Sequence, residues 1–142
     1  MANDGFRLGG FEGSQPNGPA NVLPAAFELY GCRPDAWGSS PDGTVLAFAE
    51  AKTAGDIDNA HTRRQLRVFG GCRMRGSARL CPLYVAIPRS AAYELDRVLI
   101  DIELIRARHV VRLHVPNILL EEPPHGARNA TSAFLAASGR RN

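Results

Sequence analysis

The chain has 142 residues, of which 44% are hydrophobic and 22% charged, a composition typical of one soluble globular domain and not of a disordered or fibrous chain. Its apolar runs, such as residues 83–87, are too short to cross a membrane, and its first residues lack a secretion signal, so we expect a cytoplasmic protein without a membrane partner. Residues 59–93 carry seven arginines and no acid, and residues 1–58 carry eight acids and three basic groups, a pattern typical either of a protein that binds an anionic polymer or of a solvated surface.

The first part of the chain predicts a lead-in followed by a β-hairpin. Residues 1–26 are dense in glycine and proline, which disfavour a helix, so we expect an irregular lead-in. A strand is predicted over residues 28–37. After a tight turn at residues 39–43, residues 44–52 are apolar on both faces until Glu50, as in a central strand covered on both sides.

The next part of the chain alternates helices and strands. A helix is predicted over residues 59–69, and Gly70-Gly71 is expected to end it. A buried strand at residues 81–87 is closed by proline. Ser90 is expected to cap an amphipathic helix that runs to about Arg106, because apolar residues recur there at three- and four-residue spacing. The last strand is predicted at residues 109–115.

These elements predict an α/β domain with a mixed β-sheet flanked by helices, in the order β-β-α-β-α-β. We expect its core to occupy residues 27–116. Residues 117–142 contain few anchors and are expected to form a partly flexible tail.

Two acids and an amine are predicted to meet at the end of the second strand. Glu50 and Lys52 are two residues apart and therefore share one face of the strand. A hairpin turn centred on residues 41 and 42 brings Asp35 opposite Phe48, diagonal to Glu50. Carboxylates this close repel each other unless a cation or a proton joins them, and Mg²⁺ prefers such oxygen ligands. The alternative is an exposed acid pair with a salt-bridging lysine.

Lys52 is the only lysine, whereas the chain has 16 arginines. Arginine is always charged and presents a wide planar fork, whereas lysine is a compact cation whose pKa can be shifted. A lysine kept in an arginine-rich chain indicates a position that needs an amine, unless it lies there by chance.

The sequence Pro34-Asp35, followed 15 positions after the aspartate by Glu50-Ala51-Lys52 and then by a helix with Gln65, resembles the PD-(D/E)XK nuclease superfamily. The resemblance covers residues 28–115 and implies the restriction-endonuclease-like fold. It implies that Asp35, Glu50 and the Ala51 backbone carbonyl hold Mg²⁺, for which Mn²⁺ can substitute, and that Lys52 assists the attacking water. Gln65 with Phe69 resembles the helix motif of the exonuclease-like branch, in which tyrosine is more usual than phenylalanine and both residues face the site.

Two features of the sequence leave open which acidic residues bind the metal. The family often takes a further acid from an N-terminal helix, and here Glu28 is preferred over Glu12 for that role. Pro41-Asp42 also matches the motif, but Asp42 fits the turn, where its side chain is expected to bond local backbone. We therefore prefer Asp35 as the metal ligand.

The resemblance and the basic block together predict a Mg²⁺-dependent deoxyribonuclease, with endonuclease preferred over exonuclease. DNA is the expected partner, and a homodimer, with or without a separate targeting protein, would supply two active sites for two strands. The alternatives are a DNA-binding or assembly module that has lost its chemistry, and a regulatory interaction protein with a structural Asp/Glu/Lys cluster. The candidate phosphate contacts are Arg63, Arg64, Arg67, Arg73 and Arg75.

Cys32, Cys72 and Cys81 are an odd number without the close four-ligand spacing of a zinc or iron–sulfur site. We expect reduced thiols, with the first and last of them in the core. His61 lies one helical turn before Gln65 and is expected more often at a surface than at a site.

Overall fold

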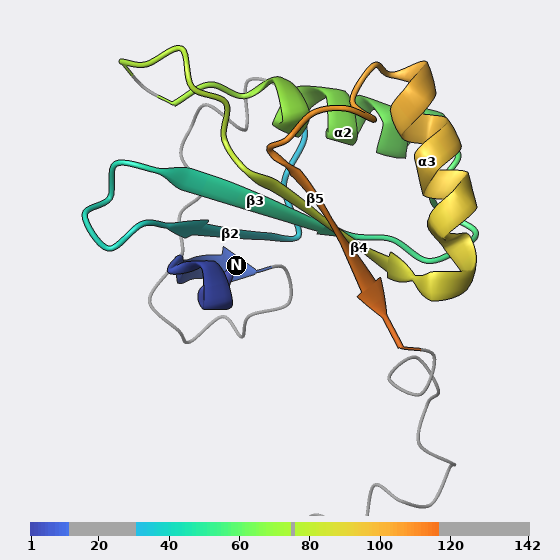
Figure 1. Cartoon of the computed structure of the whole chain (residues 1–142), viewed down its shortest axis with the longest axis horizontal. Coiled ribbons are helices and arrows are strands. Elements are labelled where there is room, and N and C mark those ends of the chain that lie inside the picture. Colours follow the sequence, from blue (N-terminus) through green and yellow to red (C-terminus); the bar gives the residue numbers. More distant parts are fainter. Residues whose placement is uncertain (12–30, 75, 117–142) are drawn as a thin grey trace, which may run out of the picture.

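A computed structural model describes residues 1–11, 31–74 and 76–116 (Figure 1). The predicted tail at residues 117–142 lies outside the described residues, as do Glu12, Glu28 and Arg75. Within them the chain forms a mixed α/β fold, with one five-stranded sheet and two α-helices. No helix in these ranges is long and apolar enough to span a membrane.

The sheet has the strand order β1-β2-β3-β4-β5. Its strands are β1 (Arg7–Phe11), β2 (Ala36–Ser39), β3 (Leu46–Ala51), β4 (Leu83–Pro88) and β5 (Val110–Val115). The first three strands pair antiparallel, whereas β3, β4 and β5 are parallel. Helix α2 (Ala60–Gly71) connects β3 to β4, and α3 (Ala92–Asp101) connects β4 to β5. The predicted order of the last six elements is confirmed, with one strand added before them.

Both helices lie on the same side of the sheet (Figure 1) and enclose one hydrophobic core. Strand residues alternate between the two faces, so every second side chain of β3 and β4 faces the helices. The Phe48 ring of β3 packs on the Phe69 ring of α2, with centroids 5.7 Å apart. The other fully buried apolar side chains of this core are Ile57, Leu66, Leu83, Val85, Ile87, Leu95, Val98 and Leu99.

The expectation of an irregular lead-in was wrong for its described part, which forms a 3₁₀ turn (Ala2–Asp4) and strand β1. A Cβ on Gly9 would lie 2.4 Å from the Trp37 ring, so only glycine lets β1 lie so close to β2 at this point. The pairing register also shifts between Leu8 and Gly10. This irregularity breaks the alternating pattern by which a strand is recognised.

The first predicted strand and the hairpin register also needed correction. Strand β2 covers Ala36–Ser39 rather than residues 28–37, and Ala36 pairs with Ala49. The turn is therefore centred one residue later than expected, which brings Asp35 level with Glu50 instead of Phe48. A shift of two residues along the partner strand keeps the same face, so the predicted side-chain convergence survives.

Helix α2 begins where expected, with Asn59 as its N-cap: the Asn59 side chain accepts a hydrogen bond from the Thr62 backbone N–H. Gly70 and Gly71 were expected to end the helix, but they form its last two residues. A Cβ on Gly70 would lie 2.6 Å from Leu104 Cδ1, whereas one on Gly71 would meet nothing within 4 Å. Gly70 is thus needed for packing and not for a turn.

This difference between two adjacent glycines predicts opposite mutational effects. Gly71→Ala should stabilise the protein by about 0.5–1 kcal/mol, because alanine loses less backbone entropy in a helix. Gly70→Ala should lose that gain because Leu104 must move, leaving this variant about 1–2 kcal/mol less stable than Gly71→Ala. Urea unfolding of the two variants measures the difference, and equal stabilities would contradict the packing role of Gly70.

The second predicted helix was too long. Helix α3 ends at Asp101, two residues before Glu103, whose φ of 63° is left-handed. Ser90 does not cap it: its N-cap is Ala91, without a side-chain hydrogen bond, after a 3₁₀ turn at Arg89–Ala91. The apolar periodicity continues past the helix because Ile102 and Ile105 still pack against the core from the following turns.

Candidate active site

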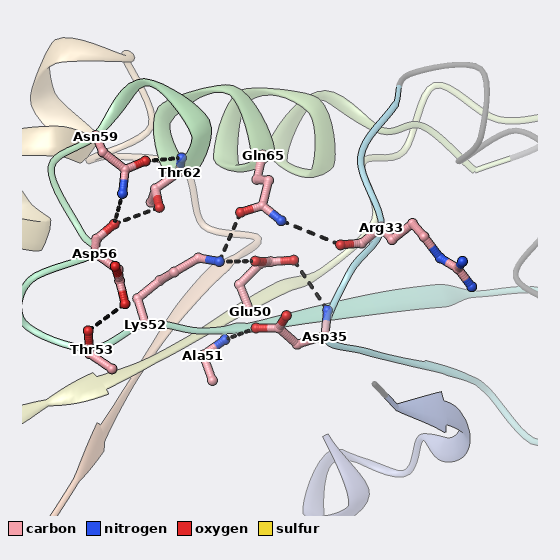
Figure 2. Close-up of polar contacts among 10 residues, drawn as sticks. All are labelled: Arg33, Asp35, Glu50, Ala51, Lys52, Thr53, Asp56, Asn59, Thr62 and Gln65. Atoms are coloured by element: carbon pink, nitrogen blue, oxygen red, sulfur yellow. Dashed lines mark hydrogen bonds and ion pairs between the residues drawn. The ribbon is translucent and has the colours of Figure 1, made fainter. Parts of the chain in front are cut away.

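The predicted acids, the lysine and the glutamine come together at the C-terminal end of β3 (Figure 2). Lys52 Nζ lies 2.7 Å from Glu50 Oε2 and donates a hydrogen bond to Gln65 Oε1 at 2.8 Å. Asp35 Oδ2 accepts from the Ala51 backbone N–H at 2.6 Å. Glu50 Oε1 accepts from the Asp35 backbone N–H at 3.3 Å. These contacts form one connected network across β3, α2 and the residue before β2.

Helix α2 is oriented toward the site by a polar network in the loop after Lys52, also drawn in Figure 2. The Asp56 carbonyl accepts from Asn59 Nδ2 at 2.8 Å and from Thr62 Oγ1 at 2.6 Å. Thr53 Oγ1 donates to the Asp56 carboxylate at 2.6 Å. These bonds fix the first turn of α2, and Gln65, one turn further on, is thereby held against Lys52.

Burial dominates the electrostatics of the site. The Glu50 side chain has no exposed surface, and the Lys52 side chain is 11% exposed. Burial raises the pKa of Glu50 to about 7, the hydrogen bond from Lys52 opposes that rise, and the Asp35 charge adds to it. The pair of acids therefore carries more negative charge than one ammonium can offset once Glu50 ionises.

The donor set suits a hard cation that keeps several waters. Asp35 and Glu50 supply two carboxylates, and the described residues contain no group of three His, Cys, Asp or Glu side chains that could hold a metal ion. Mg²⁺ is typically bound through one or two carboxylates plus water, whereas structural zinc needs four closely placed ligands. A cation at this site would depend on these two carboxylates and on the Ala51 carbonyl as a third oxygen donor.

Asp42, the second Pro-Asp aspartate, lies in the β2–β3 turn. Its carboxylate accepts hydrogen bonds from the Ser40 and Thr44 hydroxyls and from the Thr44 backbone N–H. The Ser40 bond above all lowers the pKa of Asp42. The expected local bonding of this side chain is confirmed, and it is Asp35 that shares hydrogen bonds with Glu50 and Ala51.

Two helix residues near Gln65 lie apart from the network. Phe69 is completely buried against Phe48 and belongs to the core, although the resemblance implied that it faces the site. His61 is exposed, as expected of a surface histidine. Gln65 is the α2 residue that accepts a hydrogen bond from Lys52.

The predicted phosphate contacts differ in their surroundings. Arg63 is paired with Asp58 at 2.7 Å and with Asp101 at 3.0 Å, so its charge is already offset. Arg64 and Arg67 are exposed on α2. Arg73 is exposed and donates to the Ala78 carbonyl at 2.5 Å.

Arg33 is a neighbour of the site that the sequence reading missed. Its backbone carbonyl accepts from Gln65 Nε2 at 3.4 Å, and its exposed side chain extends away from the acids in Figure 2. The buried residues Cys32 and Pro34 flank it and fix its backbone. Its position two residues before Asp35 was the signal that could have identified it.

The thiols are free, with Cys32 and Cys81 buried as expected. Burial raises the pKa of Cys72 and, together with the charge of Cys72, raises that of Cys81 to about 11. Thiols with raised pKa values are poor nucleophiles and poor metal ligands at neutral pH. Cys72 and Cys81 therefore supply no reactive thiolate at neutral pH.

Comparison with known proteins gives one partial similarity. No family model matches the chain, and no solved structure matches it significantly. A 59-residue stretch is 37% identical to an aspartate-semialdehyde dehydrogenase from Cryptococcus neoformans var. neoformans. The match covers 42% of this chain, which spans only 16% of the length of that relative.

Proposed function

We propose that this protein is a Mg²⁺-dependent nuclease that hydrolyses phosphodiester bonds of DNA on a restriction-endonuclease-like fold. One observation carries the proposal: the only lysine of an arginine-rich chain is held between Glu50 and Gln65, beside a second carboxylate from Asp35. The mixed sheet, with Glu50 near the end of its middle strand and Asp35 just before the neighbouring strand β2, is compatible with that fold.

The proposed chemistry divides among these side chains. Asp35, Glu50 and the Ala51 carbonyl would hold magnesium, or manganese in its place, which polarises the phosphodiester and lowers the pKa of a bound water. Lys52 orients the attacking water and offsets the charge that develops on the phosphate. Gln65 accepts a hydrogen bond from the Lys52 amine and so positions it.

DNA is the proposed substrate because exposed arginines occur along α2 and the loop after it, in the same stretch of sequence as Gln65. Endonuclease action is preferred over exonuclease action. A homodimer, with or without a separate targeting protein, would place one site on each strand.

Incubating the purified protein with plasmid and linear DNA tests this function. Cleavage is expected with Mg²⁺ or Mn²⁺ and not with EDTA, and Glu50→Gln should abolish it. Cleavage that survives in EDTA, or that is unchanged in the Glu50 variant, would refute the proposal. Conversion of the supercoiled plasmid before the linear DNA shortens would distinguish an endonuclease from an exonuclease.

A DNA-binding or assembly module without catalysis is the second candidate. The Lys52 amine already contacts Glu50 and Gln65, which is also what a purely structural ion pair would show. Retained DNA binding without cleavage in the same assay would favour that module. Loss of both would favour a regulatory interaction protein in which the cluster is structural.

The different surroundings of two arginines of α2 predict different effects on DNA binding. Arg67 is exposed and forms no ion pair with a described residue, whereas Arg63 is engaged by two aspartates. Arg67→Ala should make the slope of log binding constant against log salt concentration less steep by about one, the change expected for one lost phosphate contact. Arg63→Ala should leave that slope unchanged. Fluorescence anisotropy in EDTA over a potassium chloride series measures both slopes, and equal slopes for the two variants would contradict the assignment.

A further inference from the structure

A hollow of about 650 Å³ lies at the opposite end of the parallel strands from Lys52. Lys52 follows the end of β3, whereas Pro82 and His109, which line the hollow, precede the starts of β4 and β5. Because β3, β4 and β5 run parallel, Lys52 lies at the C-terminal ends of these strands and the hollow lies at their N-terminal ends. The hollow shares no residue with the candidate active site.

The lining of this hollow combines three kinds of surface. Half-buried apolar side chains of Leu80, Pro82 and Val111 form one part. Two exposed arginines, Arg79 and Arg108, line another part, and neither makes an ion pair with a described residue. Cations without a protein partner beside an apolar surface favour a ligand that is both anionic and partly apolar.

The third surface is the Asp4 carboxylate. Its Oδ2 accepts a hydrogen bond from the Tyr84 hydroxyl at 2.6 Å and lies 3.8 Å from the N-terminal ammonium of Met1, whereas its Oδ1 accepts no hydrogen bond from the described residues. His109, on the β5 side, is anchored through its Nε2 to the Gly70 carbonyl at 2.8 Å. One oxygen of Asp4 can therefore accept a donor from a ligand, while two arginines outweigh its charge.

We propose that this hollow binds a nucleotide, either free or as a unit of single-stranded nucleic acid. Its phosphate would lie against Arg79 and Arg108, its base against Leu80, Pro82 and Val111, and an amino group of the base would donate to Asp4. The volume falls within the range of about 300–1,000 Å³ that is usual for small-molecule sites. A bare anion would leave the apolar part and the carboxylate unused, and an apolar ligand would leave the guanidinium groups unused.

Calorimetric titration of the full chain in EDTA with dAMP, dTMP and inorganic phosphate tests the proposal. dAMP should bind more tightly than dTMP, whose base has no amino group, and more tightly than phosphate. Arg79→Ala and Arg108→Ala should each weaken dAMP binding about fivefold or more. Arg89→Ala is the matched control, because Arg89 is also exposed but lies outside the hollow, and it should bind as the unchanged protein does.

Two further measurements keep the test independent of catalysis. Glu50→Gln should lose DNA cleavage but keep dAMP binding, so a failure of the nuclease proposal does not affect this one. Asp4→Asn should reduce the preference for dAMP over dTMP. If a single-stranded oligonucleotide also binds, and its binding also depends on Arg79, the natural ligand is single-stranded nucleic acid. If dAMP binds and the oligonucleotide does not, the natural ligand is a free nucleotide.

Three results would overturn the proposal. The first is dAMP binding that is no tighter than phosphate binding. The second is unchanged binding in both the Arg79 and the Arg108 variants. The third is loss of dAMP binding in Glu50→Gln, which would place the nucleotide at the candidate active site instead.

Discussion

Asp35→Asn is expected to lower the rate of Mg²⁺-dependent DNA cleavage by about 100- to 1,000-fold. The substitution replaces a carboxylate oxygen by an amide nitrogen while keeping the size of the side chain. It removes one of only two carboxylates in the network, and an amide that still contacts the Ala51 N–H cannot supply the lost negative charge. Single-turnover cleavage of a labelled duplex at saturating protein measures the chemical step apart from DNA binding.

The chain contains its own control for this variant. Asp42 also follows a proline, but its carboxylate is used by Ser40 and Thr44 in the β2–β3 turn. Asp42→Asn should therefore keep the cleavage rate within about twofold and lower the stability only slightly through the weaker turn. Equal losses of cleavage in the two variants, or a nearly unchanged rate in Asp35→Asn, would show that the network does not act in catalysis.

Some features of the site follow from local rules and could be predicted from sequence. Glu50 and Lys52 share a face because side chains alternate along extended backbone, and the pairing with β4 continues to Lys52, whose N–H donates to the Ala86 carbonyl. Asp35 reached the same place although its predicted partner was wrong, because the error of two residues preserved the face. The contact of Gln65 with Lys52 needs α2 to begin near Asn59, which the capping residue indicates, and to pack on β3 through Phe69 and Phe48.

Other features depend on tertiary contacts that no local pattern reports. Strand β1 exists because Gly9 admits the Trp37 ring, and a glycine-rich segment otherwise indicates a loop. Helix α3 ends before Glu103 in a left-handed conformation that is unusual for glutamate. The raised pKa of Glu50 also needs the completed core, since burial is its largest cause and appears only after α2 has packed on the sheet.

That burial makes the stability of the protein depend on pH in a direction opposite to the usual one for an acid. The pKa of Glu50 is about 7 in the folded protein and 4.5 as the ordinary value, so between these pH values the folded state binds more protons than the unfolded state. Stability therefore falls as the pH rises from about 4.5 to 7, by about 3 kcal/mol from this group. Below pH 4.5 both states are protonated, and the favourable contribution is fully present.

Glu50→Gln should remove this slope, because the amide does not titrate. Urea unfolding at pH 5 and pH 8 should show that the unchanged protein loses about 2–3 kcal/mol more than the variant over this range. Glu94→Gln is the control, since Glu94 lies partly exposed on α3 and should leave the slope unchanged. A Glu50 variant with the slope of the unchanged protein would show that this carboxyl ionises normally.

The same measurement connects stability to the proposed metal. Above pH 7 the site must hold two ionised carboxylates against one ammonium, and a divalent cation that binds the folded state would offset the excess charge. Mg²⁺ at pH 8 should therefore stabilise the unchanged protein and stabilise Glu50→Gln much less, whereas at pH 5, where protons compete for the carboxylates, it should have little effect on either. Equal stabilisation of both proteins at pH 8 would show that the ion binds elsewhere.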